Sequence, residues 1–247
     1  MSTQVTVITV GGDRPECLAL LEKYVSRQTV QDFAWLLVDD SQEPMQPTLG
    51  QDVIRLPYES SPRESFRKNM MVALTQVKTP GVVIAEIDDW IAPGYIEEQS
   101  EILQYKELSG RSKAKYFHVA SRAYFVHPNT AHCSLCQTAF SGPKVRTAML
   151  EYLGKDRRPE QLDGYIWKRA GLTDKSKSII PGGTMTVGMK AMPGRGGLGI
   201  HHRLEEVVAA GYTPDLDLVQ LRRWIGEDYL NYLPFHTPET QPSSSGD

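Results

Sequence analysis

Three of the four residues at 86–89 are acidic. They are Glu86, Asp88 and Asp89, and they directly follow an apolar run at residues 82–85. Carboxylates this close together repel one another unless a cation neutralises them. Oxygen ligands suit Mg²⁺ or Mn²⁺, and such ions typically bridge a few carboxylates to the phosphates of a substrate. An acidic turn before a helix that begins near Pro93 is the other interpretation, so the neighbouring motifs must decide between the two.

A glycine-rich segment at residues 194–199 offers a second kind of chemistry. Repeated glycines let backbone N–H groups approach an anion closely, and a helix that follows presents the positive end of its dipole. Arg195 and Arg203 could add charge-assisted hydrogen bonds to a diphosphate. The candidate phosphate-binding residues of this segment are therefore Arg195, Gly196, Gly197 and Arg203. The alternative is a surface loop.

The elements that must position these residues alternate between buried strands and amphipathic helices. Apolar runs predict strands at residues 5–10, 35–38, 53–56 and 82–85, and a helical period predicts helices from about 14 to 25 and over 66–77. This order favours a mostly parallel sheet with helices on both faces. Ligands bind such sheets beyond the carboxyl ends of the strands. Asp39 and Asp40, which end one strand, should therefore lie on the same rim as the three carboxylates.

The second half of the chain is less regular. Its patterns predict a strand or hairpin over 116–126, helices over 144–153 and 160–170, a strand over 184–189, and helices over 204–210 and 216–229. Residues 237–247 are rich in Pro and Ser, and we expect them to be a disordered tail.

Ordered motifs over about residues 5–100 resemble the opening of the family 2 glycosyltransferases. They are the Arg14-Pro15 helix start, Gln28-Thr29, the strand that ends in Asp39-Asp40-Ser41, Arg67-Lys-Asn69, and Glu86-Ile-Asp88-Asp89 with Pro93 downstream. Their shared order is far more specific than any one of them. The resemblance implies a GT-A fold and a metal-binding strand end of the kind called the DXD motif.

The same resemblance assigns roles to residues of the donor site. It implies that Asp39 or Asp40 contacts the base or ribose of a nucleotide sugar, and that Arg67 and Asn69 stand on a helix beside that donor.

The resemblance also implies a metal site. Asp88 would bind Mn²⁺ or Mg²⁺ with Glu86 and Asp89 beside it, and His201 or His202 would be a further ligand. Glu86 stands where the family usually has Asp, so its carboxylate could serve directly or through water.

Asp163, with Trp167 four residues later, is similar to the segment that carries the catalytic Asp in inverting members of the family. Leu162 stands where these members often have Glu. An inverting transfer needs a base that takes the proton of the acceptor hydroxyl, and such a base typically contributes about 10²–10⁴-fold in rate. A solvated Asp at a helix start is the alternative, in which case a retaining mechanism stays open.

The composition limits the class of partner. The chain has 247 residues and a formal charge of −3, which excludes a strongly basic nucleic-acid coat but not a local basic groove. Its three cysteines are too few and odd in number for a disulfide scaffold, and they fit a reducing compartment. No apolar run is long enough to cross a bilayer, so we expect a cytoplasmic protein.

These features together predict a metal-dependent glycosyltransferase. It would use a nucleotide sugar, with UDP as the expected nucleotide, and transfer the sugar to a hydroxyl of a glycan or of a hydroxymethylated base in DNA. Basic clusters at 111–115, 155–158 and 168–177 would form a groove for a phosphate backbone if they share one face. A nucleotidyltransferase that consumes a nucleoside triphosphate and a non-catalytic binding module are the alternatives.

We expect one GT-A-like catalytic domain over residues 1–236. Residues 1–100 would form its nucleotide-sugar-binding half and residues 101–236 its acceptor-binding half.

Overall fold

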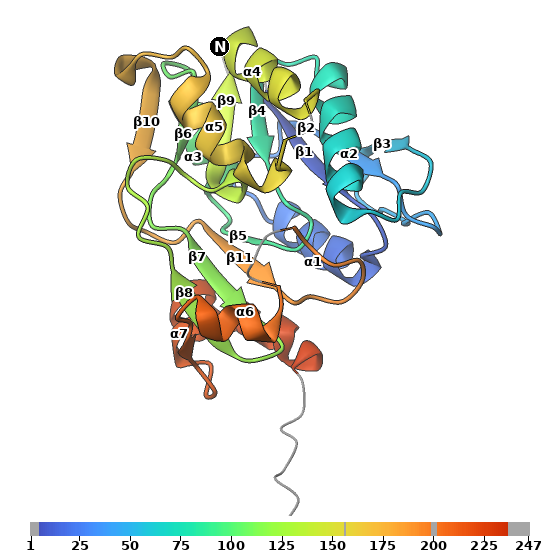
Figure 1. The fold of residues 1–247 in the computed structure, drawn as a ribbon, viewed down its shortest axis with the longest axis vertical. Helices are drawn as coiled ribbons and strands as arrows, with labels where there is room; N and C mark the ends of the chain where they lie inside the picture. The colour runs from blue at the N-terminus through green and yellow to red at the C-terminus, as the bar shows by residue number, and fades with distance from the viewer. Residues whose placement is uncertain (1–4, 156, 199–201, 237–247) are drawn as a thin grey trace, which may run out of the picture.

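The structure, a computed structural model, describes residues 5–155, 157–198 and 202–236 (Figure 1). His201 and the predicted disordered tail at 237–247 lie outside the described residues. The proposed division of the chain into a donor half and an acceptor half stays a prediction.

A seven-stranded sheet forms the centre of the fold, in the order β10-β6-β9-β4-β1-β2-β3 (Figure 1). Its strands are β1 (Val5–Gly11), β2 (Ala34–Asp39), β3 (Asp52–Arg55), β4 (Gly81–Ile84), β6 (Leu108–Arg111), β9 (Thr138–Ser141) and β10 (Lys177–Ile180). Strands β4, β1, β2 and β3 are parallel, while β9 runs antiparallel to both β4 and β6. The carboxyl ends of β1, β2 and β4 therefore meet at one edge of the sheet.

Helices cover both faces of this sheet because the side chains of its strands alternate. Val7 packs in a core with α1 (Pro15–Val25) and α3 (Tyr95–Ile102). Ile8 and Val10 point the other way and pack in a second core. The helices of that second core are α2 (Pro62–Gln76), α4 (Pro143–Leu153) and α5 (Leu162–Arg169). The predicted mostly parallel α/β architecture, with helices on both faces, is confirmed.

A second sheet stands below the edge where the central strands end, in the order β12-β8-β7-β11-β5. Its strands are β5 (Trp90–Ile91), β7 (Lys115–His118), β8 (Ala123–Val126), β11 (Thr186–Lys190) and β12 (Thr213–Pro214). Because β5 follows the acidic turn directly and pairs with β11, this sheet begins at the carboxylates.

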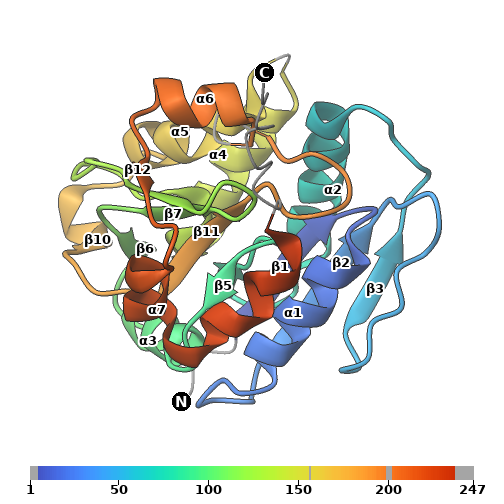
Figure 2. The same cartoon turned by 90° about the horizontal axis from the view of Figure 1, so that it is seen from below.

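The end of the described chain returns to α1 (Figure 2). It comprises α6 (Leu204–Ala209), α7 (Val219–Ile225) and the 3-10 segment η4 (Gly226–Phe235). The hydroxyls of Tyr24 and Tyr232 lie 3.0 Å apart in the core, and Trp90 Nε1 donates to Asp228 at 2.7 Å. The last segment thus holds Trp90, the residue that follows the acidic turn, through Asp228.

The predicted strands of the first half, the hairpin over 116–126 and the strand over 184–189 are confirmed. Helix α2 begins at Pro62, four residues before the expected 66, because Ser61 caps it through the N–H of Glu64. The helix expected over 216–229 is wrong in extent, since Gly226 has φ +61 and α7 ends before it. None of the helices within the described residues is long and apolar enough to cross a membrane.

Candidate active site

A cleft of about 1030 Å³ opens where the central strands end. The ends of β1 and α2, the acidic turn, strand β11, the segment at 157–169 and the glycine-rich loop all contribute to its walls. The predicted site residues that line it are Glu86, Asp88, Asp163, Arg195, Gly196, Gly197 and His202. Residues from both halves of the sequence therefore meet in one cavity.

Asp88 in the acidic turn forms a buried ion pair with Arg14, the residue that precedes α1. The distance from Arg14 Nη1 to Asp88 Oδ2 is 2.5 Å, and the two side chains are 6% and 9% exposed. Burial alone would raise the pKa of Asp88, but the charges of Arg14 and Lys190 outweigh it and hold that pKa well below its usual range. Asp88 is therefore ionised at neutral pH.

Asp89 points away from the cleft and into the protein. Its Oδ1 accepts a hydrogen bond from the backbone N–H of Met189 at 3.2 Å, which joins the acidic turn to β11. Burial, together with the nearby Glu86 and Asp88, raises the pKa of Asp89 well above its usual value. The structure thus brings Glu86 and Asp88 to the cavity and leaves Asp89 behind its wall.

Lys190, at the end of β11, is the cationic centre of this wall. Burial lowers the pKa of its ammonium, but Asp89, Asp88 and Glu86 outweigh that effect and raise the pKa above its usual value. The side chain is 9% exposed and still lines the cleft. Lys190 and Arg14 are thus the two buried cations beside the carboxylates of the turn.

Among the described residues, the ligand atoms that lie within 4.8 Å of one another are those of Glu86, Asp89 and Cys136, a group without Asp88 or His202. Asp88 and Glu86 offer carboxylate oxygens, and His202 lines the same cavity. Burial and the charge of Lys190 lower the pKa of His202 to about 3, so its imidazole is neutral at pH 7 and can donate a lone pair. Cys136 lies with Glu86 and Asp89, but burial raises the pKa of its thiol and keeps it protonated.

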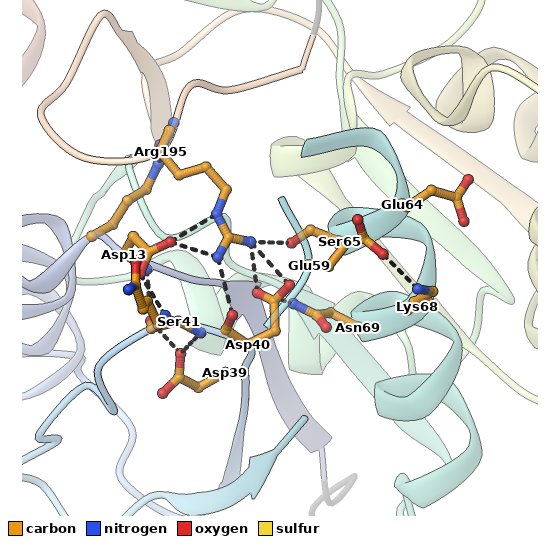
Figure 3. Close-up of polar contacts among 12 residues, drawn as sticks. Asp13, Asp39, Asp40, Ser41, Glu59, Glu64, Ser65, Lys68, Asn69 and Arg195 are labelled. Carbon is orange, nitrogen blue, oxygen red and sulfur yellow. Dashed lines mark hydrogen bonds and ion pairs between the residues drawn. The ribbon is translucent and has the colours of Figure 1, made fainter. Parts of the chain in front are cut away.

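The glycine-rich loop is fastened to the end of β2 by Arg195 (Figure 3). Its Nη1 donates to both carboxylate oxygens of Asp40 at 2.9 Å and to Ser65 Oγ at 2.7 Å. Its Nη2 donates to Asp13 Oδ2 at 2.6 Å. Asn69 Nδ2 donates to Asp40 Oδ1 at 2.9 Å. The predicted residues Asp40, Asn69 and Arg195 therefore form one network, with Asp40 buried inside it.

Both carboxylate oxygens of Asp39 accept hydrogen bonds from residues that follow β2. Ser41 donates to its Oδ1 through both the backbone N–H, at 2.8 Å, and the hydroxyl, at 2.5 Å. Met45 N–H and Arg55 Nη1 donate to its Oδ2 at 3.0 and 2.6 Å. Asp39 is 1% exposed, so in this conformation it shapes the loop after β2 and does not face the cavity.

Two glycines of the loop are required by close contacts within the protein. Gly194 has φ +93, and a Cβ there would lie 2.0 Å from the carbonyl oxygen of Asp13. A Cβ on Gly197 would lie 2.2 Å from Cε1 of His202. Gly196 has open space around its Cα, so its backbone is the part of the loop that a ligand can approach.

Arg67 and Arg203 do not reach the cavity wall. Arg67 donates to Glu64 at 2.6 Å and to the carbonyl of Leu153 at 3.3 Å. Arg203 is exposed beside the start of α6. Their predicted roles at the donor stay predictions.

Asp163 stands in the first turn of α5 and lines the same cleft as the acidic turn. Its Oδ1 accepts the N–H of Gly164 at 2.6 Å. Burial raises the pKa of Asp163, although this hydrogen bond and the histidines at 132 and 127 oppose the shift. Both histidines also line the cleft, with ring centroids 6.1 Å apart. A carboxylate with a raised pKa is a stronger base than an exposed one.

No known protein family and no curated protein matches this sequence. Solved structures of S. aureus TarS, a family 2 glycosyltransferase, do match the structure. One superposes with a TM-score of 0.52 at 17% identity, covering 75% of this chain and 36% of that one. The structure of TarS 1–349 superposes with a TM-score of 0.50 at 16% identity, covering 75% of this chain and 60% of that one. The fold is GT-A-like. The resemblance predicted this fold, and the chain spans less than two thirds of either TarS structure.

Sequence reasoning missed two residues at the centre of this GT-A-like site. The sequence marks Arg14 as part of a helix start but carries no sign that it pairs with Asp88. Lys190 carries no motif, but it follows the apolar strand predicted at 184–189. A charged residue that ends a buried strand was the signal that singled out Asp39 and Asp40, and the same signal applies to Lys190.

Proposed function

We propose that this chain is a glycosyltransferase that moves a sugar from a nucleoside diphosphate, with UDP as the expected nucleotide, to a hydroxyl acceptor. One observation carries the proposal. A single cavity at the carboxyl edge of a GT-A-like sheet is lined both by Asp163 and by Glu86 and Asp88 of the acidic turn. A carboxylate base in the same cavity as the diphosphate site is what an inverting glycosyl transfer needs.

The donor would lie along the ends of β1 and α2. Gly11, Gly12 and Phe66 line this part of the cavity, and Gly196 presents an open backbone to it. Asp88 and His202, with Glu86 beside them, would hold Mn²⁺ or Mg²⁺, which neutralises the charge of a diphosphate leaving group when bound. The ammonium of Lys190 adds a fixed positive charge at the same wall.

Asp163 would act as the general base. It takes the proton of the acceptor hydroxyl as that oxygen forms its bond to the anomeric carbon. The bond from this carbon to the diphosphate oxygen breaks, and the electron pair leaves with the nucleoside diphosphate. In this proposal the acceptor oxygen displaces the diphosphate directly, and a direct displacement inverts the anomeric carbon.

The test begins with thermal unfolding in the presence of nucleotide sugars and nucleoside diphosphates, with and without Mn²⁺. A ligand at about 100 times its Kd stabilises the folded state by about 2.7 kcal/mol. Turnover is then followed through the released nucleotide. A glycosyltransferase releases a nucleoside diphosphate, whereas a nucleotidyltransferase releases pyrophosphate from a triphosphate, and a binding module releases neither.

The variant Asp163→Asn separates binding from chemistry. We expect it to keep the donor-induced thermal shift and to lose about 10²–10⁴-fold in turnover. Asp174→Asn, at a fully exposed carboxylate outside the cleft, is the matched control and should keep both. Full turnover in Asp163→Asn would remove this residue as the base and reopen a retaining mechanism.

A further inference from the structure

One side of the cleft is strongly cationic. Four basic side chains line it around Asp163, at Arg157, Arg158, Lys168 and Arg169. All four are exposed, and among the residues that the structure describes no ion pair joins them to a carboxylate. Glu160, which stands between them in the sequence, is paired instead with Arg63 at 3.3 Å. Positive charge therefore accumulates here although the whole chain carries −3.

Two basic residues of the first cluster noted in the sequence are already engaged within the protein. Arg111 forms an ion pair with Glu98, and Lys115 donates to the carbonyl of Gly183. Of the three basic clusters noted in the sequence, only the side chains at 157–158 and 168–169 line the cleft, on the part of the chain that carries Asp163. A neutral glycan acceptor would leave these four charges without a partner, whereas a phosphate backbone supplies one.

Two tyrosine rings lie beside these basic side chains in the cleft. The rings of Tyr152 and Tyr165 have centroids 4.6 Å apart, and both line the cleft. The guanidinium of Arg157 lies over the two rings, at 5.2 and 5.3 Å from their centroids. Aromatic rings and guanidinium planes are the surfaces on which proteins stack unpaired bases. Tyr152 is buried, so the Tyr165 ring and the Arg157 guanidinium are the flat groups left for a base, and they favour a nucleic acid over a phosphate polymer without bases.

The depth of Asp163 adds a geometric requirement. Its side chain is partly buried inside the cavity, so the reacting hydroxyl must enter the cleft. A group on a base within a duplex meets this requirement only when its nucleotide is extruded. The cavity of about 1030 Å³ is slightly larger than the about 300–1,000 Å³ of typical small-molecule sites, which leaves room for a nucleotide beside a donor.

We propose that the acceptor is DNA with hydroxymethylated bases, held through its phosphates by Arg157, Arg158, Lys168 and Arg169, with the target nucleotide extruded toward Asp163. This inference rests on the proposed function and names its acceptor. The hydroxymethyl oxygen forms the new bond to the anomeric carbon, its proton passes to Asp163, and the nucleoside diphosphate leaves with the electrons of the broken bond. No further reactant is needed.

The first experiment measures binding of a labelled single-stranded oligonucleotide with 5-hydroxymethylcytosine to the full chain by fluorescence anisotropy. Between about 50 and 200 mM salt, the logarithm of the binding constant should fall linearly with that of the salt concentration, by about 0.7 per phosphate contact. Lys168→Ala and Arg158→Ala should each reduce the slope by about one contact. Lys175→Ala, at an exposed cation outside the cleft, is the control. Binding that ignores salt, or an equal loss in the control, overturns the proposal.

Two further arms identify the source of the effect. An abasic oligonucleotide of the same length keeps the phosphates and lacks the bases, and binding as tight as that of the modified strand would overturn the nucleic-acid assignment. Binding of UDP is measured on the same variants. Weaker UDP binding in Lys168→Ala would assign the charge to the donor and also overturn the proposal.

The transfer assay completes the test. Sugar transfer to the strand with hydroxymethylcytosine, and not to the same strand with cytosine, is the expected result. Transfer to neutral oligosaccharides alone overturns this inference and leaves the proposed function intact. Salt-dependent DNA binding without binding or turnover of any nucleotide sugar overturns the proposed function instead.

Discussion

Arg14 and Asp88 form a buried ion pair between the start of α1 and the acidic turn, with 2.5 Å between Arg14 Nη1 and Asp88 Oδ2. The carboxylate that the resemblance assigns to a metal is therefore already held by a guanidinium, which also donates through Nε to the carbonyl of Arg195 at 2.6 Å. One arginine thus connects the acidic turn to the glycine-rich loop.

Removing one partner of this pair should destabilise the protein more than removing both. Asp88→Ala leaves the guanidinium of Arg14 buried and unpaired, and we expect a loss of about 3–5 kcal/mol in the free energy of unfolding. The double variant Arg14→Met, Asp88→Ala removes the stranded charge and should recover part of the loss. Urea unfolding of the three proteins measures both. A loss below about 1 kcal/mol in Asp88→Ala would mean that solvent screens the pair.

Divalent metal should be needed for tight nucleotide binding. We expect chelation to weaken the thermal shift that UDP produces, and added Mn²⁺ to restore it, because Asp88 and His202 offer the donor atoms. His202→Ala should lose the Mn²⁺-dependent part of the shift. His127→Ala changes another histidine of the same cleft and should keep it. A shift that does not respond to metal in the unaltered protein would contradict the predicted metal site.

The clamp between Arg195 and Asp40 should resist conservative replacement. Arg195→Lys keeps the charge but loses the planar geometry that binds Asp40, Asp13 and Ser65 together, so stability should fall by about 2–3 kcal/mol. Lys68→Ala removes the exposed ion pair with Glu59, which solvent screens, and should leave stability nearly unchanged. Equal losses in the two variants, measured by chemical unfolding, would show that the network adds nothing beyond a surface pair.

Activity should depend on pH through Asp163. Burial raises the pKa of this carboxyl in the folded state, so kcat/KM should fall on the acid side at a pH above the about 3.9 of an ordinary aspartate. The raised pKa also affects the stability of the fold, because the folded state favours the protonated form of Asp163. Stability is therefore lost as the pH rises from the pKa of the unfolded state through that of the folded state. Asp163→Asn should abolish the acid limb and be at least as stable as the unaltered protein at pH 7. An acid limb that persists in the variant assigns the titration to another group.

Two glycines of the loop should differ in their response to replacement by alanine. Gly194→Ala places a methyl group on the carbonyl of Asp13 at φ +93, so it should displace Arg195 and weaken donor binding by about tenfold or more. Gly196→Ala meets open space and keeps its N–H, so donor affinity should change by less than about twofold. Titration of UDP into both variants measures the difference. Similar losses in both would mean that the loop is not held by its contact with Asp13.

Periodicity predicted the elements whose apolar runs are long, such as β1, α1 and β4. It could not predict β6, β9 or β10, because strands of four residues carry too short a pattern and owe their place to pairing with distant segments. The rim of acidic residues was predicted because strand ends converge in a parallel sheet. Which carboxylate faces the cavity was not, since the inward turn of Asp89 depends on the backbone of Met189.

The contact between Asp89 and Met189 joins positions a hundred residues apart in the chain. During synthesis, the acidic turn therefore leaves the ribosome long before the strand that finishes it. A fragment that stops at residue 100 would contain the whole run of motifs that resembles a glycosyltransferase, yet it would lack β11, Lys190 and the glycine-rich loop. The recognisable motifs are therefore synthesised before the site can form. The site is complete only when β11 has paired with β5.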